Sequence, residues 1–311
     1  MLNRREFLIA GAGFAAMSAA RDRTFRVAHS GNMWADNIEE GIKACARYGF
    51  DGIEPFRNKI LNYVDRPEVF KELLDNAGIR LATCSNGGPM ANNFIDPTQT
   101  KQTIDDHARF ARDFIAHFGC THFKLNLGGG RPEGGTTDEQ LKTMAKTLNE
   151  LGKRTADSGI RLAPHPHIWT PLERENEIDR VLELTDPRYV YLTADTAHLR
   201  MGGVDPVELI NSHHDRVAAV HWKDTPVKYR GHTGPTPSQE EHQRVNLYKN
   251  LGTGGVDFAA FTEVLRKHQF NGWVTLDFGK PRPGEGSVDQ NVSSNIKYLH
   301  EVLDIKLKSF S

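Results

Sequence analysis

Short hydrophobic segments rich in β-branched residues recur along the chain, and their length predicts strands rather than helices. These segments cover residues 25–29, 52–55, 79–84, 121–127, 160–165, 189–194, 217–222 and 273–278. Most of them start about 25 to 40 residues apart, which leaves room for one helix after each strand. The pattern therefore predicts eight successive strand–helix units.

The stretches between these segments carry hydrophobic residues at the three- and four-residue spacing of amphipathic helices. Three such series are Ile38, Ile42 and Cys45; Leu141, Met144, Leu148 and Leu151; and Phe258, Phe261, Val264 and Leu265. Glycine readily adopts the left-handed conformation found at helix C-termini. We therefore expect Gly49 and Gly152 to end the first two of these helices.

Eight alternating strands and helices in one chain predict an α/β fold of the (β/α)8 TIM-barrel type. A doubly wound parallel sheet is the alternative, but it would need a glycine-rich phosphate loop after the first strand. The residues there, 29–33 (HSGNM), do not form such a loop. No linker divides the chain, so we expect a single barrel domain over residues 21–311.

One interval departs from this regularity. The seventh and eighth predicted strands lie about twice as far apart as the others, and the gap contains a Gly/Pro-rich segment, 229–237, followed by polar residues up to Lys249. In a barrel this loop lies on the C-terminal face, where active sites form. A lid, a contact between copies in a homo-oligomer and a solvated insertion are the alternatives.

Residues 1–20 have the features of an export signal rather than of the barrel. Arg4 and Arg5 precede a short apolar run, and the small residues Ser18 and Ala20 occupy the positions that a signal peptidase requires. The adjacent arginines before Phe-Leu resemble a twin-arginine signal. We therefore expect an exported, periplasmic protein; a frayed amphipathic N-terminus is the alternative.

Composition narrows the range of partners. The 311 residues include 39 Lys+Arg and 40 Asp+Glu, a formal net charge of -1. Such a balance gives no electrostatic attraction for nucleic acid or an anionic membrane. No apolar run reaches the length of about 18 residues typical of a membrane span. Three cysteines are too few for a disulfide scaffold, whereas 14 histidines are many for this length.

Several of these histidines follow predicted strands, at the end of a barrel where side chains converge. The four strands from the fifth to the eighth end in His165, Asp195, His221 and Asp277. Two imidazoles and two carboxylates suit Mn²⁺, Zn²⁺, Fe²⁺ or Co²⁺ better than Mg²⁺ or Ca²⁺, which prefer oxygen ligands. We expect one divalent metal ion, with Mn²⁺ the first candidate.

Other polar residues at strand ends are candidates for acid–base chemistry. A metal that polarises a carbonyl makes the adjacent C–H acidic enough for a protein base. Asp277, Glu54 and His167 are the candidate bases. Lys124 and Lys223 are candidates for stabilising the developing oxyanion, although either could equally form a structural ion pair.

A further set of residues is suited to binding the substrate. Trp34, Phe56 and Trp169 are aromatic residues near strand ends that could stack on a sugar ring, with packing as the alternative. Asn126 alternates with apolar residues in the fourth strand and is expected to point into the barrel. His198 follows Asp195 by three residues and could bind substrate or support the metal ligands.

Several short segments of the sequence resemble motifs of the xylose-isomerase-like TIM-barrel superfamily of sugar isomerases and epimerases. They are residues 49–54 (GFDGIE), 195–199 (DTAHL), 221–224 (HWKD), 251–258 (LGTGGVDF) and 272–277 (GWVTLD). The resemblance extends from about Phe25 to Leu303. Within the superfamily, residues 165–170 (HPHIWT) together with Asp195 and His198 are most similar to the inosose dehydratase-like branch.

The resemblance implies one divalent metal held by a glutamate, an aspartate, a histidine and a glutamate after strands five to eight. Asp195 and His221 match this pattern, whereas His165 and Asp277 replace the two glutamates. In the epimerases of the family those glutamates also act as the acid–base pair on opposite faces of the substrate. The replacements favour chemistry with a single base, such as aldose–ketose isomerisation or β-elimination.

The expected function is that of a metal-dependent sugar isomerase or epimerase acting on a sugar or keto-polyol through an enediolate. The first alternative is a lyase that dehydrates an inosose or eliminates from a keto-glycoside. The second is a sugar-binding protein without catalysis. A DNA-repair endonuclease of the same fold would need three metals and a basic surface, which the charge balance disfavours.

Overall fold

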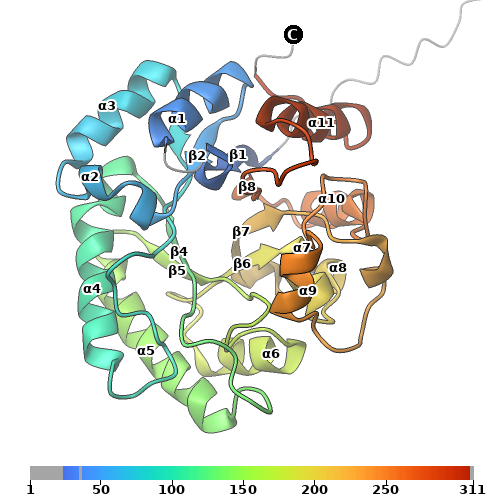
Figure 1. The fold of residues 1–311 in the computed structure, drawn as a ribbon. Coiled ribbons are helices and arrows are strands. Elements are labelled where there is room, and N and C mark those ends of the chain that lie inside the picture. Colours follow the sequence, from blue (N-terminus) through green and yellow to red (C-terminus); the bar gives the residue numbers. More distant parts are fainter. Residues whose placement is uncertain (1–23, 35–36, 309–311) are drawn as a thin grey trace, which may run out of the picture.

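Eight parallel strands lie within residues 24–34 and 37–308, the part of the chain that the computed structural model describes (Figure 1). Their bounds are Arg26–Ser30 (β1), Gly52–Glu54 (β2), Arg80–Leu81 (β3), His122–Leu125 (β4), Arg161–Pro164 (β5), Leu192–Asp195 (β6), Val217–Trp222 (β7) and Trp273–Leu276 (β8). All eight fall inside the segments that the sequence pattern predicted, give or take one residue at an end. The predicted export signal, residues 1–20, lies outside the described residues.

The strands close into a barrel. Six of them pair side by side in the order β3-β2-β1-β8-β7-β6, and β4 pairs with β5. A parallel bridge between Leu162 and Val190 joins β5 to the start of β6. On the other side the Thr83 hydroxyl, just after β3, donates to the carbonyl of His122 in β4. The predicted (β/α)8 barrel is therefore present.

Helices surround the strands (Figure 1). Those between the first and fifth strands are Ile38–Arg47 (α1), Leu61–Val64 (α2), Pro67–Ala77 (α3), Thr100–Asp113 (α4) and Asp138–Ala156 (α5). Those that follow are Glu175–Leu184 (α6), Thr196–Met201 (α7), Pro206–His213 (α8), Gln239–Arg244 (α9), Phe258–Lys267 (α10) and Val288–Glu301 (α11). None of the described helices is long and apolar enough to cross a membrane.

Glycine ends one of the two predicted helices but not the other. Gly49 has a φ of 78° just after α1, as expected. The prediction for Gly152 was wrong, because α5 continues to Ala156. A Cβ atom at Gly152 would lie only 2.5 Å from the Cβ atom of Tyr189. This glycine therefore allows α5 to approach the residues before β6 closely, rather than ending the helix.

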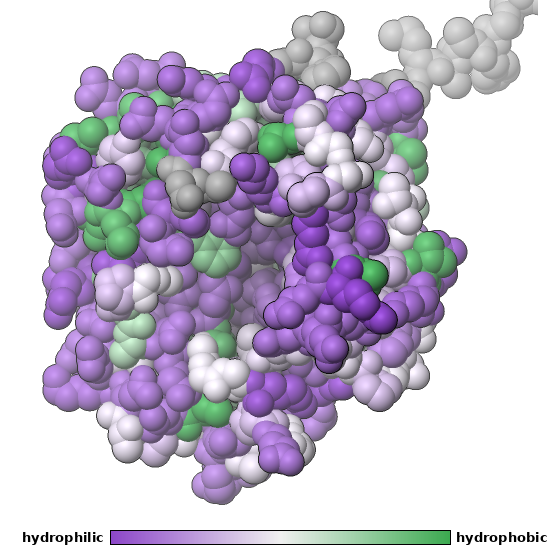
Figure 2. All heavy atoms as spheres, viewed as in Figure 1, coloured by the Kyte–Doolittle hydropathy of each residue, from purple (hydrophilic) through white to green (hydrophobic). Residues whose placement is uncertain are grey.

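The long interval between β7 and β8 is anchored at both ends. Asp224 and Lys249 form an antiparallel bridge across it. The buried carboxylate of Asp224 also accepts hydrogen bonds from the backbone N–H groups of Gly254 and Val256, at 2.9 and 3.0 Å. The enclosed segment contains α9 and lies over the C-terminal ends of the strands. Figure 2 shows a hollow in this largely hydrophilic face of the molecule.

All three cysteines are buried and unpaired. They are Cys45, Cys84 and Cys120. Burial raises the pKa of Cys120 to about 12, because the thiolate would be poorly solvated. A thiol with so high a pKa is a weak nucleophile near neutral pH.

Candidate active site

His165, Asp195 and His221 form a buried cluster at the C-terminal ends of β5, β6 and β7. Each offers one ligand atom, and these atoms all lie within 4.8 Å of one another. Asp195 Oδ2 lies 3.5 Å from His165 Nε2 and 3.7 Å from His221 Nδ1. The three side chains come together because neighbouring parallel strands end at the same edge of the barrel.

The two carboxylate oxygens of Asp195 have different environments. Oδ1 caps α7 by accepting the backbone N–H groups of Ala197 and His198, both at 3.0 Å. Within the described residues, Oδ2 has no hydrogen-bond partner, and neither has either ring nitrogen of His165 or the Nδ1 atom of His221. Unpartnered buried polar atoms are costly unless a ligand satisfies them. Two nitrogens and one carboxylate oxygen fit a divalent transition-metal ion or Zn²⁺.

Glu54, at the end of β2, holds His221 from the opposite side. Its carboxylate lies 3.0 and 3.1 Å from His221 Nε2 and accepts a 2.8 Å hydrogen bond from the Thr275 hydroxyl. Burial disfavours the charged form of Glu54, but His221 and Lys124 outweigh it and lower its pKa to about 2. A carboxylate bound to one ring nitrogen fixes the histidine so that the other nitrogen faces the ligand. The structure thus places Glu54 behind His221.

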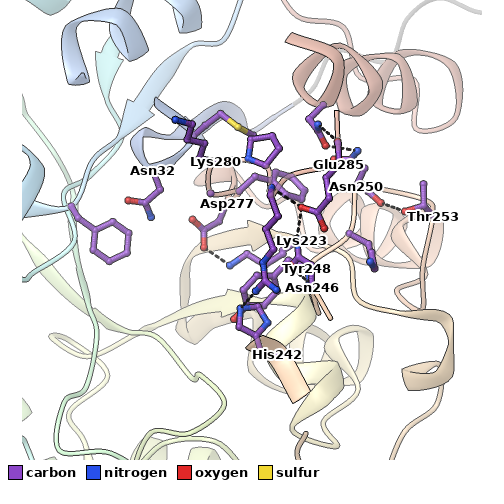
Figure 3. Close-up of a pocket in the computed structure, with 18 of the residues that line it drawn as sticks. Asn32, Lys223, His242, Asn246, Tyr248, Asn250, Thr253, Asp277, Lys280 and Glu285 are labelled. Atoms are coloured by element: carbon purple, nitrogen blue, oxygen red, sulfur yellow. Dashed lines mark hydrogen bonds and ion pairs between the residues drawn. The ribbon is translucent and has the colours of Figure 1, made fainter. Parts of the chain in front are cut away.

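Asp277, after β8, pairs with Lys223. The Lys223 ammonium lies 2.6 Å from Asp277 Oδ2 (Figure 3). It also lies 3.6 Å from Asp195 Oδ2. Burial opposes ionisation of Asp277, yet this ammonium holds the pKa of the carboxyl well below its ordinary value. Asp277 Oδ2 is also 3.5 Å from His221 Nδ1. Asp277 therefore adjoins the cluster of three, and its predicted role as a fourth metal ligand stays a prediction.

His167 and His198 stack beside the cluster, with ring centroids 3.5 Å apart and planes inclined by 30°. His198 is buried, and its Nε2 lies 3.9 Å from Asp195 Oδ2. Neither of its ring nitrogens has a hydrogen-bond partner in the part of the chain that the structure describes. Burial lowers the pKa of His167 to about 4. Burial likewise holds the pKa of His198 well below its ordinary value. Both rings are thus neutral side chains next to the ligand atoms.

Two cavities adjoin the cluster. The larger holds about 490 Å³ between the strand ends and the segment around α9, and the smaller holds about 370 Å³ beside β4. Phe56, His167 and Asp277 line both. Lys124 and Asn126 line the smaller cavity, and the Lys124 ammonium lies 3.9 Å from Glu54 Oε1. A small substrate in either cavity would meet His167 and Asp277.

Two predicted aromatic residues line neither cavity. Trp34 packs against His29, with ring centroids 5.1 Å apart. Trp169 donates its indole N–H to the carbonyl of Pro237 at 2.6 Å. These contacts explain where the side chains of Trp34 and Trp169 lie. That either ring stacks on a sugar stays a prediction.

The sequence pattern did not single out several residues of the larger cavity. They are Asn32, His242, Asn246, Tyr248, Lys280 and Arg282. The unusual length of the interval between β7 and β8 pointed to the segment that carries three of them. Nothing in its composition identified the individual side chains.

Comparisons with known proteins agree with this architecture. A family model described as xylose isomerase-like TIM barrel matches residues 42–300. An inosose dehydratase of Clostridium botulinum (strain Alaska E43 / Type E3) is 24% identical over 282 residues, which cover 85% of this chain and 86% of the relative. An inosose dehydratase of Lacticaseibacillus casei is 27% identical over 86% of this chain and 90% of the relative.

Solved structures with the same fold include proteins described as enzymes and as a metal-binding protein. The IOLI protein, described with a binding zinc atom, superposes with a TM-score of 0.71 at 15% identity, over 92% of this chain and all of that chain. The 3-keto-D-glucoside 4-epimerase YcjR of E. coli gives a TM-score of 0.67 at 18% identity, over 87% and 97%. At these identities the likeness is one of fold.

Proposed function

The chain belongs to the xylose isomerase-like TIM-barrel family, and from this premise we propose that it is a divalent-metal-dependent enzyme acting on a sugar or keto-sugar. The proposed reaction begins with removal of the proton next to a carbonyl group. The observation that carries this proposal is the set of unpartnered buried atoms on His165, Asp195 and His221. His165 lines the smaller cavity, and Asp277, 3.5 Å from His221 Nδ1, lines both cavities.

We propose that these three side chains hold the metal ion. Once bound, a divalent cation supplies Lewis-acid polarisation of a substrate carbonyl. The two imidazole ligands favour Mn²⁺, Zn²⁺, Fe²⁺ or Co²⁺ over Mg²⁺ and Ca²⁺. The zinc described for the IOLI protein supports a transition-metal or zinc site of this kind, and Mn²⁺ remains the first candidate.

The chain places two candidate bases at the cavities. Asp277 and His167 line both, so either can receive a proton from a substrate carbon that lies between them. The Lys124 ammonium lines the smaller cavity, and that of Lys223 lines the larger. A fixed positive charge at either place stabilises the oxyanion that develops when the proton leaves. Glu54 acts through His221 and orients it.

Dehydration is a second candidate outcome, because the same first step leads to both reactions. The enediolate can be reprotonated, which gives an isomerase or epimerase, or it can expel a neighbouring hydroxyl, which gives a dehydratase. Two relatives named inosose dehydratase, at 24% and 27% identity over most of the chain, support dehydration. The likeness in fold to a 3-keto-D-glucoside 4-epimerase agrees with the first reaction.

NMR spectroscopy of reactions in D2O separates these outcomes. The metal-loaded protein is incubated with ketoses, inosose and 3-keto-glycosides, and His221→Ala with chelator serves as the control. Deuterium at the carbon next to the carbonyl, without loss of water, identifies an isomerase or epimerase, whereas an unsaturated or deoxy product identifies a dehydratase. The proposal would be overturned if protein that holds about one metal ion per chain produced neither deuterium incorporation nor a dehydrated product with any of these substrates.

We also propose that residues 1–20 direct export to the periplasm and are then removed. The paired Arg4 and Arg5 and the small residues Ser18 and Ala20 support this. N-terminal sequencing of the protein recovered from the periplasm tests it. A protein that stays in the cytoplasm with Met1 intact would contradict it.

A further inference from the structure

The wall of the larger cavity carries more positive than negative charge. Four of its side chains are cationic, namely Lys223, Lys249, Lys280 and Arg282, whereas two are carboxylates, namely Asp277 and Glu285. Asp277 is already paired with Lys223 at 2.6 Å. Three cations therefore face one remaining carboxylate around the cavity. Figure 3 shows Lys280 and His242 on opposite sides of the Lys223–Asp277 pair.

Arg282 is held in position without being neutralised. One terminal nitrogen, Nη2, lies 3.0 Å from His242 Nε2, and the other, Nη1, donates to the carbonyl of Gln243 at 3.2 Å. Both partners are uncharged acceptors. Among the described residues no carboxylate lies within 4.0 Å of the guanidinium, whose remaining N–H groups stay available.

Glu285, the one carboxylate left over, is committed elsewhere. Its Oε2 atom accepts the backbone N–H of Arg282 and the side-chain amide of Asn246, both at 2.9 Å. These bonds fix the turn that carries Arg282 and tie it to the segment around α9. Glu285 thus shapes the cavity wall and forms no ion pair with the Arg282 guanidinium among the described residues. Its charge offsets one of the three remaining cations, which leaves the wall with an excess of positive charge.

Lys249 and Lys280 add charge to the same wall. The Lys249 backbone is fixed by hydrogen bonds to the backbone of Asp224 at 3.2 and 2.9 Å. Lys280 is exposed and lies four residues after β8. Neither ammonium forms an ion pair within residues 24–34 and 37–308. Both lysines therefore reinforce the field around Arg282.

We propose that Arg282, supported by Lys249 and Lys280, binds an anionic substituent of the substrate, so that this enzyme acts on an acidic sugar. A guanidinium pre-positioned by neutral acceptors recognises carboxylate and phosphate oxygens in the same way. This inference rests on the proposed function, since the carbonyl end of the same molecule would lie at the cluster of His165, Asp195 and His221. The cavity of about 490 Å³ is lined by Arg282 and also by Asp277, whose Oδ2 atom lies 3.5 Å from His221 Nδ1.

Binding measurements with matched sugars test this inference. Each neutral sugar is paired with its acidic counterpart, namely glucose with glucuronate, fructose with 2-ketogluconate, and both with their 6-phosphates. Titration calorimetry at low ionic strength is expected to show that at least one acidic member binds tenfold or more tightly than its neutral partner. Preference for the sugar acids identifies a carboxylate site, and preference for the 6-phosphates identifies a phosphate site.

Variants link the preference to the proposed residues. Arg282→Gln should reduce it about tenfold, and Lys280→Gln, which breaks no contact of the fold, should reduce it several-fold. Arg112→Gln removes the same charge from an exposed position of α4 and should leave it unchanged. Equal or tighter binding of the neutral member in every pair, or a preference that both cavity variants retain, would overturn the inference. If acidic sugars bind more tightly but none of them exchanges a proton in D2O, the result would instead count against the proposed chemistry.

Discussion

At the scale of single residues, the two ring nitrogens of His221 differ, because one contacts a protein side chain and the other is available to a ligand. Nε2 lies 3.0 Å from Glu54 Oε1, while the buried Nδ1 has no hydrogen-bond partner among the described residues. Although burial alone would lower the pKa of His221, the Glu54 carboxylate raises it to about 10. The same carboxylate makes the neutral ring a better electron donor when it binds a metal.

Glu54→Gln is therefore expected to weaken metal binding about 10- to 100-fold. The amide keeps the size of the side chain but removes the negative charge that orients His221. Competition between the protein and a metal indicator for Zn²⁺ or Mn²⁺ measures the change. Thr275→Val, which removes only the 2.8 Å bond to Glu54, should have a smaller effect. Unchanged metal affinity with lost turnover would show instead that Glu54 acts on the substrate.

Asp277 and Asp195 should differ in their effect on metal binding. Asp195→Asn removes a cluster ligand and should lower affinity by about 100-fold or more, whereas Asp277→Asn should lower it by less than about tenfold. The reason is that Asp277 is engaged by Lys223 at 2.6 Å. Lys223→Met removes a cation 3.6 Å from Asp195 Oδ2 and should strengthen metal binding. Equal losses in the two asparagine variants would make Asp277 a fourth ligand.

At the scale of elements, the loop after β5 is joined to the segment around α9. The buried Glu173 carboxylate accepts the backbone N–H of Trp169 at 2.6 Å and the hydroxyl of Thr236. Trp169 has a φ of 69°, a conformation that side chains other than glycine adopt at a cost. Arg174 adds hydrogen bonds to the carbonyls of Gly202 and Gly234. These contacts fix the loop after β5 against the segment around α9.

Glu173→Gln is expected to loosen this connection and to lower the free energy of unfolding by about 2 kcal/mol, because it removes the buried carboxylate that faces Arg174 Nε at 3.2 Å and accepts the Trp169 N–H. Hydrogen exchange followed by mass spectrometry should show faster exchange over residues 232–238. Glu175→Gln changes the exposed first residue of α6, two positions further along the chain, and is the matched control. Equal exchange in both variants would mean that Glu173 does not hold the segment.

Strand positions and strand-end residues were predictable from the sequence, whereas contacts across the barrel were not. β-branched runs located the strands, and their common direction predicted that His165, Asp195 and His221 would meet. The pairing of Glu54 with His221 joins residues 167 positions apart on β2 and β7. Such a contact depends on how the barrel closes, which no local pattern records. Gly152 was misjudged for the same reason, since its role lies in the distant Tyr189.

The side chains of the cavity wall around α9 could not be predicted from the sequence either. Its residues follow neither a helical nor an alternating pattern, so the sequence indicated an unusual segment without its contents. His242 and Tyr248 reach the cavity because Asp224 anchors the end of the segment through the backbone of Lys249. The predicted alternatives of a lid and a contact between copies stay predictions.

At the scale of the whole molecule, buried neutral histidines connect stability to pH. Burial lowers the pKa of His29, His107 and His122 to about 4. For His107 the contacts show why, since Asn86 Oδ1 accepts the backbone N–H of Asn126. The amide nitrogen of Asn86 must then face His107 Nε2, at 2.9 Å. That nitrogen can accept this hydrogen bond only while it carries no proton.

The unfolded chain therefore binds protons at these three positions between about pH 6.5 and pH 4, where the folded chain does not. Stability should be at its full value above pH 6.5 and fall as the pH drops through this window, by up to about 3 kcal/mol for each histidine. Urea unfolding in the presence of chelator, at several pH values from 7 to 4, measures the loss. His107→Gln should reduce the loss of unfolding free energy between pH 7 and pH 4 by the contribution of one histidine. His117→Gln, at an exposed position of the barrel surface, should leave the pH dependence unchanged. Parallel profiles for the wild type and His107→Gln would show that His107 does not carry this dependence.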